Sequence, residues 1–174
     1  MKKLLIFLIG GIMIYAMNLK APDFKERIPL KYVYSLCGGE NISPELMWDN
    51  FPVETKSFAI TMFDPDAPTD HGWWHWIVVN IPVNVTHFPE GAGNPDSPYF
   101  NLGYQTLNDY GEIGYGGPCP PPGSPHRYII TVYALDIEGF EVSRDINPQI
   151  LSEAIKEHTI ESASVMGYYQ RGWR

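Results

Sequence analysis

Short apolar runs separated by proline and glycine dominate this chain. The runs combine β-branched and aromatic residues, as strands do, and the 16 prolines and 16 glycines favour turns over long helices. The predicted strands span 28–36, 58–63, 74–81, 126–135 and 163–169. The segment 85–117 is rich in Gly, Asn, Asp and Pro, and is predicted to be irregular with one short strand.

One helix is predicted, near the end of the chain. Asn147 precedes Pro148, so an N-cap side chain is followed by proline at the first helical position. The apolar residues Ile150, Leu151 and Ile155 then follow helical spacing. The whole pattern predicts an all-β domain, or a mostly-β domain with this single late helix.

Polar side chains occur at the ends of three predicted strands. Asp64 ends one strand, His75 lies near the start of the next, and His126 and Tyr128 begin the third. Strand alternation places each on an otherwise apolar face, so that His75 is expected to share its face with Ile77. If the three faces meet, these four polar side chains line one pocket. The alternative is that each is separately hydrogen-bonded in the interior.

Two stiff segments adjoin these strand ends. Residues 64–68, Asp-Pro-Asp-Ala-Pro, form a turn in which each proline fixes its own φ and restricts the residue before it. Residues 114–125 are dense in glycine and proline and lead directly into the third strand. Glycine lets backbone approach a ligand closely and proline has little entropy to lose, so this segment is predicted to be a pocket wall.

Length and charge narrow the classes of function. A chain of 174 residues and 19.7 kDa predicts one domain with a substantial core. Its formal net charge is −8, and the body of the chain has no cluster of lysine or arginine. A nucleic-acid binder needs a basic footprint, so that class is not expected. A small phosphorylated ligand remains compatible, because one arginine or a few backbone N–H groups can hold a phosphate.

The first 16 residues differ from the rest. Two lysines precede an apolar run from Leu4 to Ala16, which predicts a signal peptide at 1–16 and a single domain at 17–174. The run is short for a membrane span. The protein is therefore expected to be periplasmic or secreted. Two alternatives stay open: an uncleaved anchor, or translation from Met17 and a cytoplasmic protein.

The chain has two cysteines, Cys37 and Cys119. Two are too few for a disulfide scaffold, and neither lies in a zinc-binding spacing. In an exported protein the two can form one disulfide. The alternative is a pair of half-buried free thiols.

Several motifs together resemble the phosphatidylethanolamine-binding protein family. They are the 64–68 turn, Trp73 and His75 opening a Val-Val-Asn strand, and a Gly-Pro-rich segment running into His126-Arg127-Tyr128. The segments 41–44, 114–123 and 168–171 are similar to its bacterial and archaeal Raf-kinase-inhibitor-like branch. The resemblance extends from about Phe24 to Arg171.

The resemblance implies a fold and a site. The fold is a Greek-key β-sandwich in which a large antiparallel sheet packs on a smaller one, with a helix near the C-terminus. The site is a pocket for phosphate or a phosphorylated headgroup, and the matching motifs place these residues in it: Asp64, Asp66, Trp73, His75, Pro121, His126 and Tyr128. The C-terminal tyrosine that closes the pocket in animal members has no match here.

The resemblance also implies a non-catalytic binding or regulatory module without a cofactor. Its partner would be a phosphate-bearing small molecule or phospholipid headgroup, with the aspartates orienting imidazoles that donate to the anion. Some family members inhibit kinases or proteases, so the resemblance also implies, as an alternative, an inhibitor that acts through a protein interface. Bacterial relatives often pair, which makes a homodimer an expected state. A competing hypothesis is a metal-dependent hydrolase or lyase that uses Asp64, His75 and His126 as a ligand triad.

Overall fold

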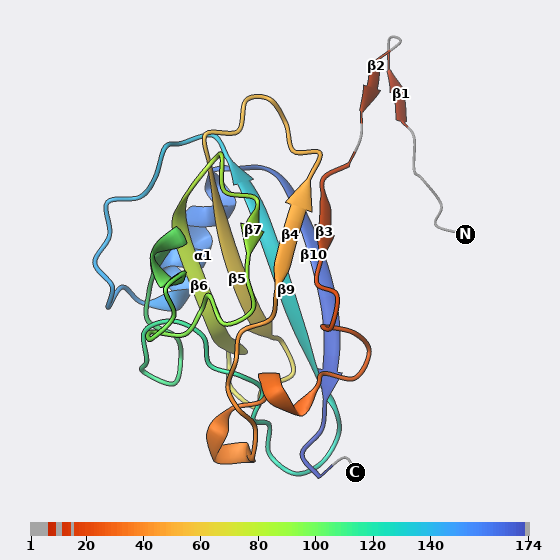
Figure 1. The fold of residues 1–174 in the computed structure, drawn as a ribbon, viewed down its shortest axis with the longest axis vertical. Helices are drawn as coiled ribbons and strands as arrows, with labels where there is room; N and C mark the ends of the chain where they lie inside the picture. Colours follow the sequence, from red (N-terminus) through yellow and green to blue (C-terminus); the bar gives the residue numbers. More distant parts are fainter. Residues whose placement is uncertain (1–6, 10–11, 15, 173–174) are drawn as a thin grey trace.

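Two antiparallel sheets and one helix build the body of the protein. The computed structural model describes residues 7–9, 12–14 and 16–172. The five-stranded sheet has the order β10-β9-β5-β6-β8, and the three-stranded sheet has the order β3-β4-β7 (Figure 1). The elements of the body are β3 (Asn18–Lys20), β4 (Leu46–Asp49), β5 (Ser57–Asp64), β6 (Trp73–Pro82), β7 (His87–Phe88), β8 (Tyr104–Gln105), β9 (His126–Leu135), α1 (Pro148–Glu157) and β10 (Thr159–Tyr169). The predicted mostly-β class with a late helix is confirmed.

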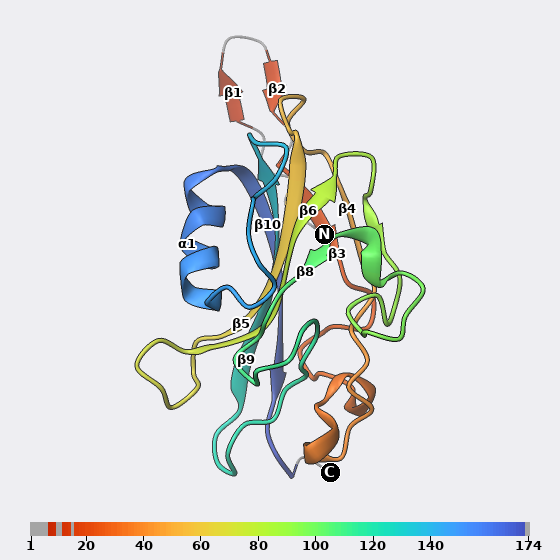
Figure 2. The ribbon, with the colours of Figure 1, turned by 90° about the vertical axis from the view of Figure 1, so that its left-hand side faces the viewer.

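The large sheet is the middle layer of three. Figure 2 shows α1 on one side of it and the small sheet on the other. Side chains from the two faces of β5 and β9 therefore enter two cores. The core toward the small sheet contains, among others, Phe58, Ile60, Met62, Tyr128, Ile130 and Val132. The core toward α1 contains Ala59, Ile77, Val79, Leu151 and Ile155.

Helix α1 begins as the sequence predicts. The Asn147 side chain accepts hydrogen bonds from the backbone N–H groups of Gln149 and Ile150, at 2.9 and 3.2 Å. These contacts satisfy donors that the first turn would otherwise leave unpaired. Leu151 and Ile155 are fully buried against the sheet, whereas Ile150 is exposed.

The predicted strand at 28–36 is wrong. The segment forms two 3₁₀ turns, η1 (Leu30–Tyr32) and η2 (Ser35–Cys37), whose hydrogen bonds are local. Its buried residues do not alternate, because Tyr32, Val33 and Tyr34 are consecutive. The Tyr34 N–H donates to the carbonyl of Pro118, so this apolar run docks on the glycine- and proline-rich segment instead of joining a sheet.

Other boundaries differ less. The last predicted strand is confirmed and is longer than expected, because β10 pairs with β9 over the whole of Thr159–Tyr169. The segment 85–117 contains two short strands, β7 and β8, where one was predicted.

The predicted signal peptide lies mostly outside the described residues. Within 1–16 the structure describes the short paired strands β1 (Phe7–Ile9) and β2 (Ile12–Ile14), and Ala16. Met17, the first residue after this segment, is already buried in the core of the domain. Among the described residues, no helix has the length and hydropathy needed to cross a bilayer.

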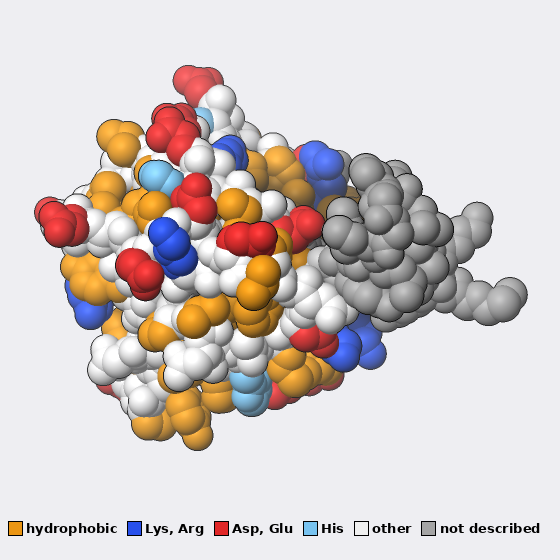
Figure 3. Space-filling model, turned by 90° about the horizontal axis from the view of Figure 1, so that it is seen from above, with side chains coloured by type: hydrophobic (Ala, Val, Ile, Leu, Met, Phe, Trp, Pro, Cys, Tyr) orange, Lys and Arg blue, Asp and Glu red, His pale blue; other side chains and the backbone are white. Residues whose placement is uncertain are grey.

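Charged side chains are dispersed on the end of the molecule opposite the strand ends Asp64, Trp73 and His126. On the face seen in Figure 3, lysine and arginine side chains lie apart from one another, among acidic and uncharged ones. This face has none of the clustered positive charge that a nucleic-acid footprint requires.

Candidate functional site

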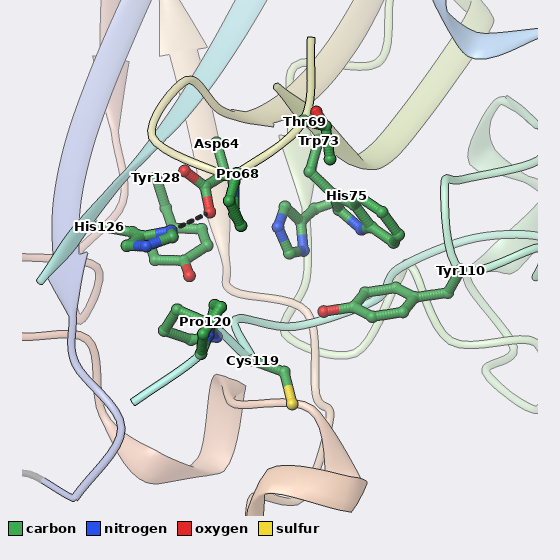
Figure 4. Close-up of a pocket in the computed structure, with 12 residues that line it drawn as sticks. Asp64, Pro68, Thr69, Trp73, His75, Tyr110, Cys119, Pro120, His126 and Tyr128 are labelled. Carbon is green, nitrogen blue, oxygen red and sulfur yellow. Dashed lines mark hydrogen bonds and ion pairs between the residues drawn. The ribbon is translucent and has the colours of Figure 1, made fainter. Parts of the chain in front are cut away.

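A cavity lies where three strands of the large sheet begin or end. β5 runs toward this end and finishes at Asp64, whereas the antiparallel strands β6 and β9 start there, at Trp73 and His126. The cavity has a volume of about 240 Å³. Its lining comes from these strand ends and from two loops: Asp64, Ala67, Pro68, Thr69, Trp73, His75, Tyr110, Cys119, Pro120, Pro121, His126 and Tyr128 (Figure 4).

A β-bulge aims His75 into the cavity. Along the β5–β6 pair, Met62 is opposite Trp76 and Phe63 is opposite Trp74, so His75 is an extra residue on β6. The bulge reverses the alternation beyond it, and Trp76 enters the core toward the small sheet while Ile77 faces α1. The prediction that His75 and Ile77 share a face is therefore wrong.

The backbone fixes the tautomer of His75. Its Nδ1 lies 2.7 Å from the carbonyl oxygen of Gly116, which can only accept, so Nδ1 carries the proton. Burial lowers the pKa of His75 to about 4, against the opposing influence of the Gly116 carbonyl. At neutral pH the ring is thus uncharged, with Nε2 as a bare acceptor. The expectation that both histidines donate to an anion does not hold for His75.

His126 and Asp64 form a buried pair on the facing wall. His126 Nδ1 lies 2.8 Å from Asp64 Oδ2, and the side chains are 12% and 4% exposed. The backbone N–H of Asp66 donates to the other carboxylate oxygen, at 2.8 Å. Asp64 therefore orients the imidazole, as the sequence predicted, and leaves His126 Nε2 for a ligand. This nitrogen becomes a donor when the ring is protonated.

Two buried donors at the cavity have no partner in the described part of the chain. They are the hydroxyl of Tyr128 and the indole Nε1–H of Trp73. Burial, followed by the nearby Asp64 carboxylate, raises the pKa of Tyr128 above its ordinary value, so the hydroxyl stays protonated. An unsatisfied buried polar group costs about 1–3 kcal/mol, so a ligand that accepts from these donors would recover stability.

The remaining wall comes from the segment before β9. Cys119, Pro120 and Pro121 line the cavity, as the wall interpretation predicted. Cys119 forms a disulfide with Cys37, which fastens the wall to the end of η2. Close packing also holds it: a Cβ on Gly117 would lie 2.1 Å from the carbonyl oxygen of Tyr32, so only glycine fits there.

The family model for phosphatidylethanolamine-binding protein matches residues 20–170 of this sequence. The chain belongs to the phosphatidylethanolamine-binding protein family. It is 41% identical to the UPF0098 protein YbhB of Escherichia coli over 157 residues, which cover 88% of this chain and 99% of that protein. It is 42% identical to a UPF0098 protein of the archaeon Methanothermobacter thermautotrophicus, over 90% of this chain and all of that protein. The predicted bacterial and archaeal branch is thereby confirmed.

Solved structures of the family share the fold. The crystal structure of Escherichia coli YbcL superimposes with a TM-score of 0.85 at 39% identity, covering 88% of this chain and 98% of YbcL. The homologue CT736 of Chlamydia trachomatis gives a TM-score of 0.74 at 37% identity, covering 89% of this chain and 97% of that protein. The names of these relatives state no catalytic activity.

Six of the seven residues that the family resemblance nominated line the cavity: Asp64, Trp73, His75, Pro121, His126 and Tyr128. Asp66 lies outside the lining. Its carboxylate forms a bidentate pair with Arg127, at 2.7 and 2.8 Å, and accepts from the Arg127 backbone N–H. The guanidinium lowers the pKa of Asp66 to about 2. The Asp66–Arg127 pair therefore attaches the 64–68 turn to the start of β9, and it helps to position the neighbouring residues of the turn and the strand.

Tyr110 is a lining residue that the sequence did not reveal. It follows β8 in an irregular loop, stacks on Tyr34 with ring centroids 4.2 Å apart, and donates its hydroxyl to Gly117. An aromatic residue in the turn Asn-Asp-Tyr-Gly carries no local signal of a pocket, because only its tertiary contacts place it there.

The metal-triad hypothesis finds no support in the geometry. The described residues contain no group of three or more His, Cys, Asp or Glu side chains that is arranged to hold a metal ion. Nδ1 of His75 faces the Gly116 carbonyl, and both oxygens of Asp64 already accept hydrogen bonds.

Proposed function

We propose that this protein binds a small oxyanion, a phosphate or the phosphate of a larger molecule, in the cavity at the end of β5, β6 and β9. The observation that carries the proposal is the pair of unpartnered buried donors, Tyr128 Oη–H and Trp73 Nε1–H. Phosphate oxygens are strong hydrogen-bond acceptors, and a phosphate group is small enough for a cavity of about 240 Å³. His126, supported by Asp64, adds a third donor when protonated.

We also propose that the site binds without catalysis. The thiol and hydroxyl groups of the lining that could act as nucleophiles are occupied or inert: Cys119 is in a disulfide, and the Thr69 hydroxyl donates to the carbonyl of Gly72. Tyr128 is held protonated by burial. A ligand in this cavity therefore meets no activated thiol or hydroxyl.

Replacing the central donor tests the proposal. Tyr128→Phe is expected to weaken the binding of inorganic phosphate by about tenfold to a hundredfold, the value of one hydrogen bond to a charged group. Isothermal titration calorimetry measures the affinity. Tyr133→Phe is the matched control, because Tyr133 lies on the same strand and its hydroxyl contacts Thr61 outside the cavity. Equal affinities for Tyr128→Phe and wild type, or a wild type that binds no phosphate, would refute the proposed function.

The disulfide supports an extracytoplasmic location, which we propose for the mature protein. Disulfides persist in oxidising compartments and are rare in the cytosol. The Cys37–Cys119 bond and the basic-then-apolar leader at 1–16 are two independent indications of export. We expect N-terminal sequencing of the native protein to begin near Met17 and fractionation to place it outside the cytoplasm. A cytosolic protein with free thiols would contradict the proposal.

A further inference from the structure

The cavity contains acceptors as well as donors. Because Nδ1 of His75 is committed to the Gly116 carbonyl, Nε2 can only accept, and none of the described residues donates a hydrogen bond to it. Figure 4 shows the His75 ring facing across the cavity toward Asp64 and Tyr128. His75 and Tyr128 lie edge to face with ring centroids 5.1 Å apart, so a ligand that reaches the Tyr128 hydroxyl also meets His75.

The Asp64 carboxylate brings negative charge to the side of the cavity that the His75 ring faces. Its carboxylate is nearly fully buried, and both oxygens accept hydrogen bonds, from His126 and from the Asp66 backbone. The ionisable groups around His75 are Asp64 from β5, His126 and Tyr128 from β9, and Tyr110 from the loop after β8. A fully deprotonated oxyanion would therefore face a lone pair and a carboxylate, and would leave the Nε2 acceptor buried and unpaired.

We propose that the cavity selects a phosphate group that still carries a proton, which it donates to Nε2 of His75, while Tyr128 and Trp73 donate to its other oxygens. This inference rests on the proposed function and narrows it to one ligand class. Inorganic phosphate and phosphate monoesters carry such a proton, with a second pKa of about 6 for monoesters. Sulfate and phosphodiesters, including the diester headgroups of phospholipids, have no proton on the sulfate or phosphate group itself at a pH near that pKa.

The selectivity has a known physical precedent in buried sites. A site built to hydrogen-bond a substrate hydroxyl rejects an analogue without it strongly, because the polar group of the site is then left unpaired. Here the unpaired group would be Nε2 of His75. Size adds little to the selection, since methyl phosphate, dimethyl phosphate and sulfate all fit a cavity of about 240 Å³.

A ligand panel on the wild-type protein tests this inference. At about pH 6, where monoesters retain much of their proton, we expect methyl phosphate to bind at least about tenfold more tightly than dimethyl phosphate or sulfate at matched ionic strength. Calorimetry measures all three. Dimethyl phosphate or sulfate within about twofold of methyl phosphate would overturn the inference while leaving oxyanion binding intact. Binding of none of the three would instead refute the proposed function.

A fourth ligand distinguishes a free phosphate or phosphate monoester from a phospholipid headgroup as the source of the phosphate group. Glycerophosphoethanolamine is a diester whose ammonium group could donate to Nε2 in place of a phosphate proton. We expect it to bind about as weakly as dimethyl phosphate, so an affinity equal to or above that of methyl phosphate would overturn the inference in favour of a lipid headgroup.

Two variants assign the selectivity to His75. In His75→Gln the amide can present either N–H or C=O to the ligand, so we expect the preference for methyl phosphate over sulfate to fall to about twofold or less. Tyr128→Phe should weaken both ligands and keep their ratio, because its hydroxyl donates to either. An unchanged ratio in folded His75→Gln would contradict the assignment, and if that variant does not fold, the wild-type panel still decides.

Discussion

Breaking the Cys37–Cys119 disulfide is expected to lower the free energy of unfolding by about 4.5 kcal/mol, the chain-entropy value for a loop of this length. The bond spans 82 residues, so its loss frees a large part of the unfolded chain. It also unfastens the cavity wall, whose next residues, 120–125, make no backbone hydrogen bonds within the described structure before β9 begins. Urea unfolding of the double variant Cys37→Ser/Cys119→Ser measures the change.

The same double variant also tests the effect of the disulfide on phosphate binding. Phosphate affinity should fall as well, because Pro120 and Pro121 line the cavity directly after Cys119. The control is wild type treated with a reducing agent, which should match the double variant, while the double variant itself should not respond to the reductant. A wild-type protein whose unfolding midpoint is the same with and without reductant would contradict the prediction.

Acid is expected to destabilise the protein through His75 by as much as about 3 kcal/mol between about pH 6.5 and about pH 4. Burial lowers the pKa of His75 to about 4 in the folded state, against 6.5 for a free histidine. In this range the unfolded chain binds the proton and the folded chain does not, so stability falls as the pH falls. Below about pH 4 both states are protonated and the His75 contribution levels off.

The matched variant for this effect is His75→Gln, which cannot titrate. We expect the difference in unfolding free energy between wild type and variant to shrink steadily as the pH is lowered through this range, measured by urea unfolding at several pH values. Asp66, with its pKa lowered to about 2, loses its contribution only in more acidic solution and does not distort the comparison. Parallel stability curves for the two proteins would show that His75 is not buried as an uncharged ring.

Local sequence was sufficient for the main strands and the helix. β5, β6 and β9 are runs of β-branched and aromatic residues bounded by proline and glycine, and α1 has its Asn147 cap and proline start within two residues. The family motifs were also local, and they nominated six residues that the fold brings to one cavity. For these features the determining interactions lie within a few residues along the chain or follow the strand period.

Other features depended on contacts between distant segments. The run 28–36 has a strand-like composition, but the Tyr34 N–H donates to the carbonyl of Pro118, and 3₁₀ turns supply the local hydrogen bonds of the segment. The family resemblance places Asp66 in the pocket, but its carboxylate pairs with Arg127, 61 positions away, outside the cavity lining. Tyr110 entered the cavity lining through its stacking on Tyr34.

Local patterns in the sequence were enough to locate β5, β6, β9, β10 and the capped helix, and its motifs indicated the family and most of the residue types of the site. The tertiary structure decided the chemistry of the site, since it set which way each group faces and what it is paired with. A bulge opposite Met62 and Phe63 turns His75 inward, and the Gly116 carbonyl makes its Nε2 an acceptor. Bulge position and tautomer depend on hydrogen bonds between segments far apart in the chain, which a local pattern does not encode.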